Sequence, residues 1–164
     1  MADLKKANDL FKKIFSVLKP PPKLTIDTWA DRYRVLSSKS SAEPGKWRTD
    51  RVPFQREVMR AISDRRTERV IMKYGAQLSK TEILMNTVGY YADYEPSPIM
   101  FLMPTQKMAE DFATTRLNDM ILSTPQLKSK IIENETSRDT KTQKDFPGGY
   151  IILTGSNSAA ELAS

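Results

Sequence analysis

Apolar residues recur at helical spacing near the start of the chain. They are separated by three, four or seven positions, which places them on one face of a helix. These residues are Leu4, Phe11, Ile14 and Leu18. Three prolines follow, and proline cannot continue the helical hydrogen-bond ladder. We therefore predict an amphipathic helix over residues 1–19 and a stiff Pro-rich linker over residues 20–23.

Three interpretations of this first helix stay open. It packs against its own domain, or it docks on a partner protein that covers the apolar face. The lysines around that face also allow a helix that lies on a membrane surface.

The next patterns predict two more helices. "LTIDTWADRYRVLSS" favours a helix that begins at about Thr25, and "FQREVMRAISD" favours one over residues 54–63. A polar stretch rich in turn-forming residues joins them. We expect Trp29, Tyr33 and Trp47 to pack this region onto the core.

From Glu68 onward, short apolar runs alternate with helical patterns. "ERVIMKY" and "PIMFLMP" read as strands, and "TEILMNTVGYYAD" and "TQKMAEDFATTRLNDMILS" read as the helices that follow them. "GGYIILTG" adds a third strand, while residues 124–146 are too polar to assign. This order predicts an α/β fold with a mainly parallel sheet over residues 24–164.

Composition narrows the possible chemistry. A chain of 164 residues makes one domain of ordinary size, and its net charge of +6 favours a polyanionic partner. It contains no cysteine and no histidine, which excludes disulfides, thiolate nucleophiles, imidazole bases and the commonest zinc ligands. We find no signal-peptide pattern and no apolar run long enough to span a membrane, so we expect a reducing, cytoplasmic setting.

The stretch "IMKYGAQLSKTEILMN" carries the most informative motif. A phosphate-binding loop, GxxxxGK[ST], follows a strand and precedes a helix, and Lys80 and Thr81 supply its last two residues. Its glycines are absent, because Tyr74 and Ser79 occupy those two positions. "SKTE" is also a capping box, in which Ser79 and Glu82 would exchange hydrogen bonds with the first turn of the helix. Both interpretations stay open here, and they are compatible because a helix N-terminus also binds phosphate.

Three other stretches bear on this choice. Gln55 precedes Lys80 by about 25 residues, the place where helicase-type motors keep a glutamine that contacts adenine. "MPTQKMAEDF" follows the second predicted strand, at the edge where α/β sheets bind ligands. "TGSNSAAELAS" follows the third strand, with Ser158 and Glu161 as a second possible capping box.

These blocks together resemble the N-terminal half of the ATPase domain of the large terminase subunit of lambda-like tailed phages. The similarity runs from about Leu24 to Ser164, through "KYGAQLSKTE", "MPTQKMAEDF" and "FPGGYIILTGSNSAAELAS". It implies a partial P-loop ATPase fold of the RecA or helicase type. It also implies a motor that cuts viral DNA and packages it into a procapsid at the expense of ATP.

The resemblance also assigns roles to residues and names partners. It implies that ATP and Mg²⁺ bind at five residues, with Thr81 on the metal, and that a segment containing Thr105 and Gln106 couples the nucleotide site to DNA. The five residues are Gln55, Gln77, Ser79, Lys80 and Thr81. The implied partners are double-stranded DNA, the small terminase subunit, which the first helix would bind, and the procapsid portal in the full-length protein. The implied location is the host cytoplasm, without a membrane partner.

Two departures from the family limit what we expect of the chain alone. The acidic pair that holds magnesium and activates water belongs to a further strand, about where this sequence ends, and the nuclease domain is missing. The stretch 74–79 also lacks the arginine that many large terminases carry. We therefore expect a motor fragment that binds nucleotide without turning it over. The alternative is an inactive remnant or an interaction module that binds the small subunit or DNA.

Overall fold

The computed structural model describes residues 23–132 and 140–156. The predicted docking helix over residues 1–19, most of the linker, and Ser158 and Glu161 lie outside the described residues. Within the described ranges, no helix is both long enough and apolar enough to cross a membrane.

Three helices form one side of the molecule around a buried tryptophan. They are α2 (Ile26–Tyr33), α3 (Gln55–Ser63) and α4 (Lys80–Asp93). Helix α2 begins as predicted, because the Thr25 amide donates to Thr28 Oγ1 at 2.8 Å and so closes the first turn. Trp29 is fully buried, and its Nε1 donates to Asp93 Oδ2 at 2.7 Å, which ties α2 to the end of α4.

A short β-ribbon and a 3₁₀ turn connect α2 to α3. They are β1 (Val35–Leu36), β2 (Gly45–Lys46) and η1 (Thr49–Arg51). Strands β1 and β2 pair antiparallel. Trp47 follows β2 and is buried, and its Nε1 donates to Thr49 Oγ1 at 3.0 Å. The predicted packing of Trp29, Tyr33 and Trp47 onto the core is thereby confirmed.

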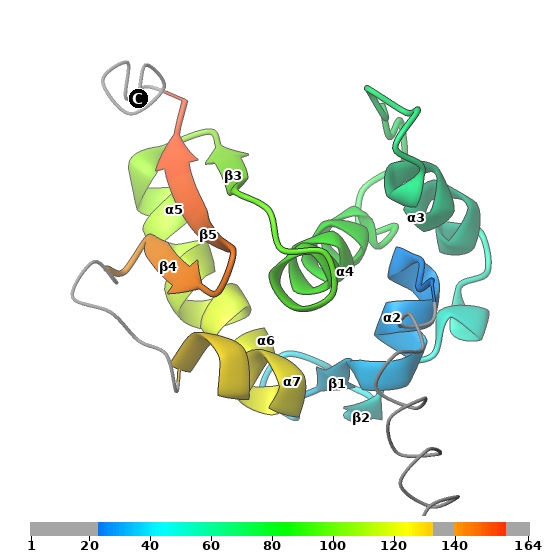
Figure 1. Ribbon diagram of the computed structural model, residues 1–164, viewed down its shortest axis with the longest axis horizontal. Coiled ribbons are helices and arrows are strands. Elements are labelled where there is room, and N and C mark those ends of the chain that lie inside the picture. Colours follow the sequence, from blue (N-terminus) through cyan, green and yellow to red (C-terminus); the bar gives the residue numbers. More distant parts are fainter. Residues whose placement is uncertain (1–22, 133–139, 157–164) are drawn as a thin grey trace, which may run out of the picture.

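The other side of the molecule is a three-stranded sheet with helices against it. Its strands are β3 (Ile99–Met103), β4 (Gln143–Phe146) and β5 (Gly149–Gly155), in the order β3-β5-β4. The helical segments between β3 and β4 are α5 (Gln106–Phe112), η2 (Ala113–Leu117), α6 (Asn118–Ser123), α7 (Pro125–Leu127) and η3 (Lys128–Ile132), of which η2 and η3 are π-helical. Figure 1 shows α4 between this sheet and the pair α2 and α3.

Apolar contacts fix the sheet on its helices. Strands β3 and β5 are parallel, with Phe101 opposite Leu153, and Leu153 is buried. The ring of Phe101 stacks on that of Phe112 at the end of α5, with 4.9 Å between the ring centroids. These contacts bury one face of the sheet against α5, as a crossover connection requires.

Two predictions about the sheet are wrong. Residues 68–74 form no strand, and Ile71 in this segment is 80% exposed. The apolar run indicated a buried strand, but a strand also needs a hydrogen-bonding neighbour, and the described strands supply none to this segment. The sheet is also mixed rather than mainly parallel, because β4 pairs antiparallel with β5.

Strand β4 could not be assigned from sequence because its first three residues are polar. It forms because a tight turn returns the chain beside β5. Gly148 lies in this turn at φ +90°, a conformation that glycine adopts without the steric cost of a Cβ. The turn at residues 147 and 148 thus leads directly into β5.

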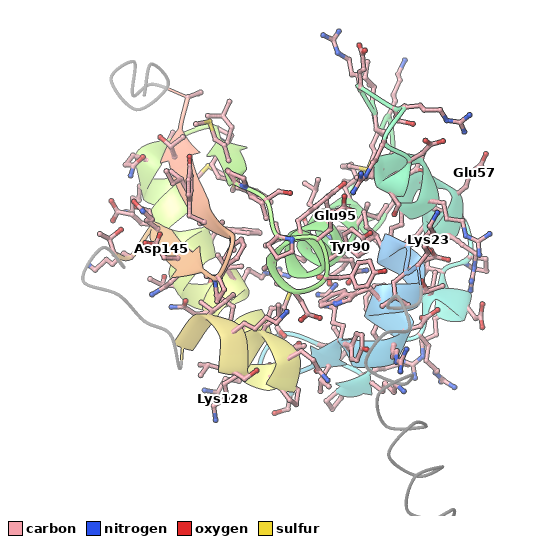
Figure 2. All side chains as sticks on the ribbon, viewed as in Figure 1. Lys23, Glu57, Tyr90, Glu95, Lys128 and Asp145 are labelled. Atoms are coloured by element: carbon pink, nitrogen blue, oxygen red, sulfur yellow. The ribbon has the colours of Figure 1, made fainter. Side chains whose placement is uncertain are left out.

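The C-terminal end of α4 is held by a buried tyrosine. Tyr90 donates to the backbone oxygen of Leu24 at 3.0 Å and lies 3.1 Å from Glu95 Oε2, and Figure 2 labels both Tyr90 and Glu95 there. Burial raises the pKa of the Tyr90 phenol, and the hydrogen bond to Glu95 raises it further. The phenol therefore stays a donor at neutral pH.

Candidate functional site

A cavity of about 200 Å³ lies where several elements of the helical side meet α6. It is lined from β1, η1, the first turns of α3 and α4, and α6. Its polar lining residues include Arg34, Arg48, Arg51, Gln55, Ser79, Glu82 and Arg116, and its apolar ones include Trp47, Met85 and Met120. A concave site with an apolar wall and a few polar groups is the usual form of a small-molecule site.

Gln55 is the first residue of α3 and lines this cavity. It is fully buried, and neither its Oε1 nor its Nε2 has a hydrogen-bond partner among the described residues. A buried amide without partners is costly, because it loses its hydrogen bonds to water and gains none in return. The residue predicted to contact adenine thus keeps one free acceptor and one free donor.

Arg34 lines the same cavity and was not expected there. It follows α2, is 4% exposed, and its guanidinium lies over the ring of Trp47 at 4.8 Å. Its Nη1 donates to the backbone oxygen of Glu82 at 3.2 Å and to Asn86 Oδ1 at 2.5 Å. Burial lowers the pKa of the guanidinium, and the neighbouring Glu82 carboxylate opposes that shift. No sequence motif marks an arginine after a helix as part of a site.

Glu82 joins the cavity to the first turn of α4. Its Oε2 accepts a hydrogen bond from Arg34 Nη2, and its Oε1 lies 3.8 Å from Arg116 Nη1 in η2. The predicted capping box is therefore wrong. Ser79 has φ +58° and makes no side-chain cap, whereas N-cap residues that cap through the side chain are extended. Two arginines attract a carboxylate more strongly than one backbone amide does, so Glu82 turns to them.

The loop before α4 is exposed and has an unusual backbone. Gln77 and Ser79 both have φ +58°, in the left-handed region that glycine favours. The glycines of the phosphate-loop pattern are absent, but the backbone at these two positions still adopts a glycine-like conformation. Loops of this kind turn backbone amides toward an anion at a helix N-terminus.

Lys80 and Thr81 begin α4 directly after this loop. The Lys80 ammonium donates to the backbone oxygen of Tyr74 at 3.2 Å and to that of Gly75 at 2.5 Å. The backbone of the loop therefore holds the Lys80 side chain in place. Neither Lys80 nor Thr81 lines the cavity, but their neighbours Ser79 and Glu82 do, so cavity and loop meet at the first turn of α4.

The predicted coupling segment lies at the carboxyl ends of β3 and β5. Thr105 caps α5 by accepting from the Met108 amide at 3.2 Å, and Gln106 Oε1 accepts from the Gly155 amide at 2.9 Å. A Cβ on Gly155 would lie 2.2 Å from the Gln106 nitrogen, so glycine is required there. Thr105 and Gln106 do not line the cavity, and the structure does not bring them to Gln55.

The described residues contain no group of three or more carboxylates that could hold a metal ion. Thr81 as a metal ligand stays a prediction from the resemblance. Of the residues predicted from sequence, Gln55 and Ser79 line the cavity, whereas the Arg34–Glu82 pair and the nearby Arg116 were not predicted. These residues are far apart in the chain, and no local spacing connects them.

Comparison with known proteins identifies sequence relatives of this chain. The family model for the phage terminase large subunit gpA, ATPase domain, matches residues 41–164. Over 112 residues the chain is 27% identical to the large subunit of terminase from Escherichia phage lambda. That match covers 68% of this chain and 17% of the lambda protein. No solved structure matches the chain. Because the family model covers most of the sequence, the chain belongs to the family of the phage terminase large subunit gpA, ATPase domain.

Proposed function

We propose that this chain is a nucleotide-binding portion of a phage DNA-packaging motor, with ATP held between the Gln55 cavity and the loop before α4. The observation that carries the proposal is the buried, unpartnered amide of Gln55 in a cavity that reaches the first turn of α4. An amide in this state gains hydrogen bonds when a base enters, since the cost of its burial has been met in the free protein.

The phosphates would lie at the N-terminus of α4. The exposed loop, the helix dipole and the Lys80 ammonium all favour an anion there. Lys80 would exchange its hydrogen bonds to the Tyr74 and Gly75 oxygens for bonds to phosphate. Thr81, the next residue, would place its hydroxyl on the Mg²⁺ that accompanies the nucleotide.

The activity of the whole motor is also a proposal for this chain, because it spans 17% of the lambda protein. We propose double-stranded DNA as a partner, which the net charge of +6 favours. The small terminase subunit and the procapsid portal are proposed from the family alone. The interaction-module alternative depends on residues 1–19, which lie outside the described part of the chain.

The test is equilibrium binding of ATP with Mg²⁺ to the purified chain, read by displacement of a fluorescent ATP analogue. Lys80→Ala should weaken ATP binding at least tenfold, because it removes the charge beside the phosphates. Lys73→Ala is the matched control, since Lys73 is an exposed lysine on the segment before the loop. Equal affinities of the two variants would refute the proposed phosphate site.

A further inference from the structure

Three buried side-chain polar atoms have no hydrogen-bond partner within the described residues. They are Arg34 Nε, Gln55 Nε2 and Gln55 Oε1. Both residues line the same cavity, although they come from different elements. Together they offer two donors and one acceptor, all removed from water.

The Arg34 guanidinium is fixed in place through its other two nitrogens. Nη1 bonds to the Glu82 backbone and to Asn86, Nη2 bonds to the Glu82 carboxylate, and the guanidinium lies over the Trp47 ring. Its Nε is left without an acceptor from the part of the chain that the structure describes. A donor held this rigidly loses little conformational entropy when a ligand accepts its hydrogen bond.

Adenine has a complementary edge. Its 6-amino group is a donor and stands between two ring acceptors, N1 and N7. The Gln55 amide can pair with the amino group and with one of these ring nitrogens, because its oxygen and nitrogen lie side by side. The other ring nitrogen then needs a separate donor. Among the described residues, Arg34 Nε is the buried unpartnered donor that remains besides Gln55 Nε2, and Arg34 also lines the cavity.

We propose that Arg34 is a specificity-determining residue of the base site, with its Nε–H donating to the ring nitrogen of adenine that Gln55 does not contact. This inference rests on the proposed nucleotide binding and extends it to a residue that the motif pattern does not include. Arg34 would thus have two roles, an ion pair with Glu82 through its terminal nitrogens and a hydrogen bond to the base through Nε.

The experiment compares ATP with 1-deaza-ATP and 7-deaza-ATP, each of which replaces one ring nitrogen by CH. The wild-type chain should bind both analogues roughly tenfold more weakly than ATP, since each loses one buried hydrogen bond. Arg34→Lys keeps the charge for Glu82 but has no Nε–H. It should bind ATP roughly tenfold more weakly than wild type and should still discriminate against only one of the two analogues.

Arg69→Lys is the matched control, because Arg69 is an exposed arginine that does not line the cavity. It should discriminate against both analogues as wild type does. Thermal unfolding of Arg34→Lys checks that the fold persists, and the analogues themselves change the ligand and leave the fold untouched.

Each alternative result has one meaning. If wild type binds either analogue as tightly as ATP, or if Arg34→Lys still discriminates against both, Arg34 does not contact the base and the inference fails. The proposed function would stand in that case, provided that ATP binding still depends on Lys80. If the wild-type chain binds no ATP, the proposed function fails and this inference fails with it.

Discussion

The cavity and the loop before α4 are built in opposite ways, although they meet at the same turn. The cavity is lined by buried groups such as Arg34 and Gln55, and Arg34 is fixed by hydrogen bonds and by the Trp47 ring. The loop is exposed, two of its residues have positive φ, and its lysine bonds to the loop's own backbone. The proposed base half of the site is therefore preformed, whereas the proposed phosphate half would have to exchange contacts to bind a nucleotide.

Stability therefore lies in the buried contacts of the cavity, and adaptability lies in the exposed loop before α4. Rigid, buried contacts reduce the entropy lost on binding, so they suit a part of the ligand that is recognised by shape. A loop with few buried contacts opens at low free-energy cost, so it suits a ligand group that must enter and leave. Substitutions of buried groups should accordingly change the free energy of unfolding more than substitutions in the exposed loop do.

The largest effect is expected from breaking the Arg34–Glu82 pair. Glu82→Ala leaves a buried guanidinium without its carboxylate, which should lower the free energy of unfolding by about 3 kcal/mol. Glu82 is 27% exposed, so we expect the lower end of the range for buried pairs. Urea denaturation measures the change.

The control for this substitution is Glu57→Ala. Glu57 is an exposed carboxylate on α3, labelled in Figure 2. Its removal should change stability by less than about 0.5 kcal/mol, as is usual for surface positions. Similar losses in both variants would show that the buried pair does not hold the cavity together.

The same pair shows what the sequence could not reveal. Gln55 and Lys80 were found from a motif and its spacing, and the helices around them from apolar periodicity. Arg34 and Glu82 are 48 positions apart, and neither belongs to a pattern that links them. "SKTE" predicted a capping box because local rules consider only neighbouring backbone groups. In the structure, Glu82 binds the guanidinium of Arg34, which comes from another element, instead of a backbone amide.

The strand predicted at residues 68–74 failed for a related reason. Apolar content reports a tendency toward burial, but a strand exists only where another strand accepts its hydrogen bonds. Conversely, β4 is polar and still pairs, because the turn at Gly148 places it beside β5. The type of an element was predictable where its hydrogen bonds form within the segment, as in a helix. It was not predictable where the segment needs a neighbouring strand to pair with.

The second prediction compares a glycine packed in the buried core of α4 with a glycine in the exposed loop. In α4, a Cβ on Gly89 would lie 2.3 Å from Cη2 of Trp29, a buried ring that is hydrogen-bonded to Asp93. Gly89→Ala should therefore cost about 2 kcal/mol through overpacking, despite the higher helix propensity of alanine. In the loop, a Cβ on Gly75 meets only the Leu78 side chain, at 3.4 Å. Gly75→Ala should change stability by less than about 0.5 kcal/mol. Equal melting temperatures of the two variants would contradict the contrast between a rigid and an adaptable region.

The third prediction concerns backbone strain in the loop. Ser79 has φ +58°, and a residue with a Cβ is strained there whereas glycine is not. Ser79→Gly should therefore be more stable than Ser79→Ala by about 1 kcal/mol, even though glycine gains entropy in the unfolded chain. Paired thermal denaturation of the two variants measures this difference. If alanine is the more stable of the two, the left-handed conformation at Ser79 is not the one the protein adopts in solution.

The smallest effect is expected at Asp119 in α6, which accepts a hydrogen bond from Ser37 Oγ at 2.5 Å and is also hydrogen-bonded to Ser40, a residue that lines the cavity. The hydrogen bonds from Ser37 and then Ser40 lower the pKa of the Asp119 carboxyl below its ordinary value. A lowered pKa in the folded state stabilises the protein above the unfolded pKa, and the stabilisation is lost as the pH falls through the folded pKa. Asp119→Asn should therefore reduce stability by about 0.5 kcal/mol at neutral pH, and the difference from wild type should vanish in acid.

Asp111→Asn on α5 serves as the exposed control. A difference between Asp119→Asn and wild type that persists unchanged in acid would show that the ionised carboxylate is not what stabilises this contact.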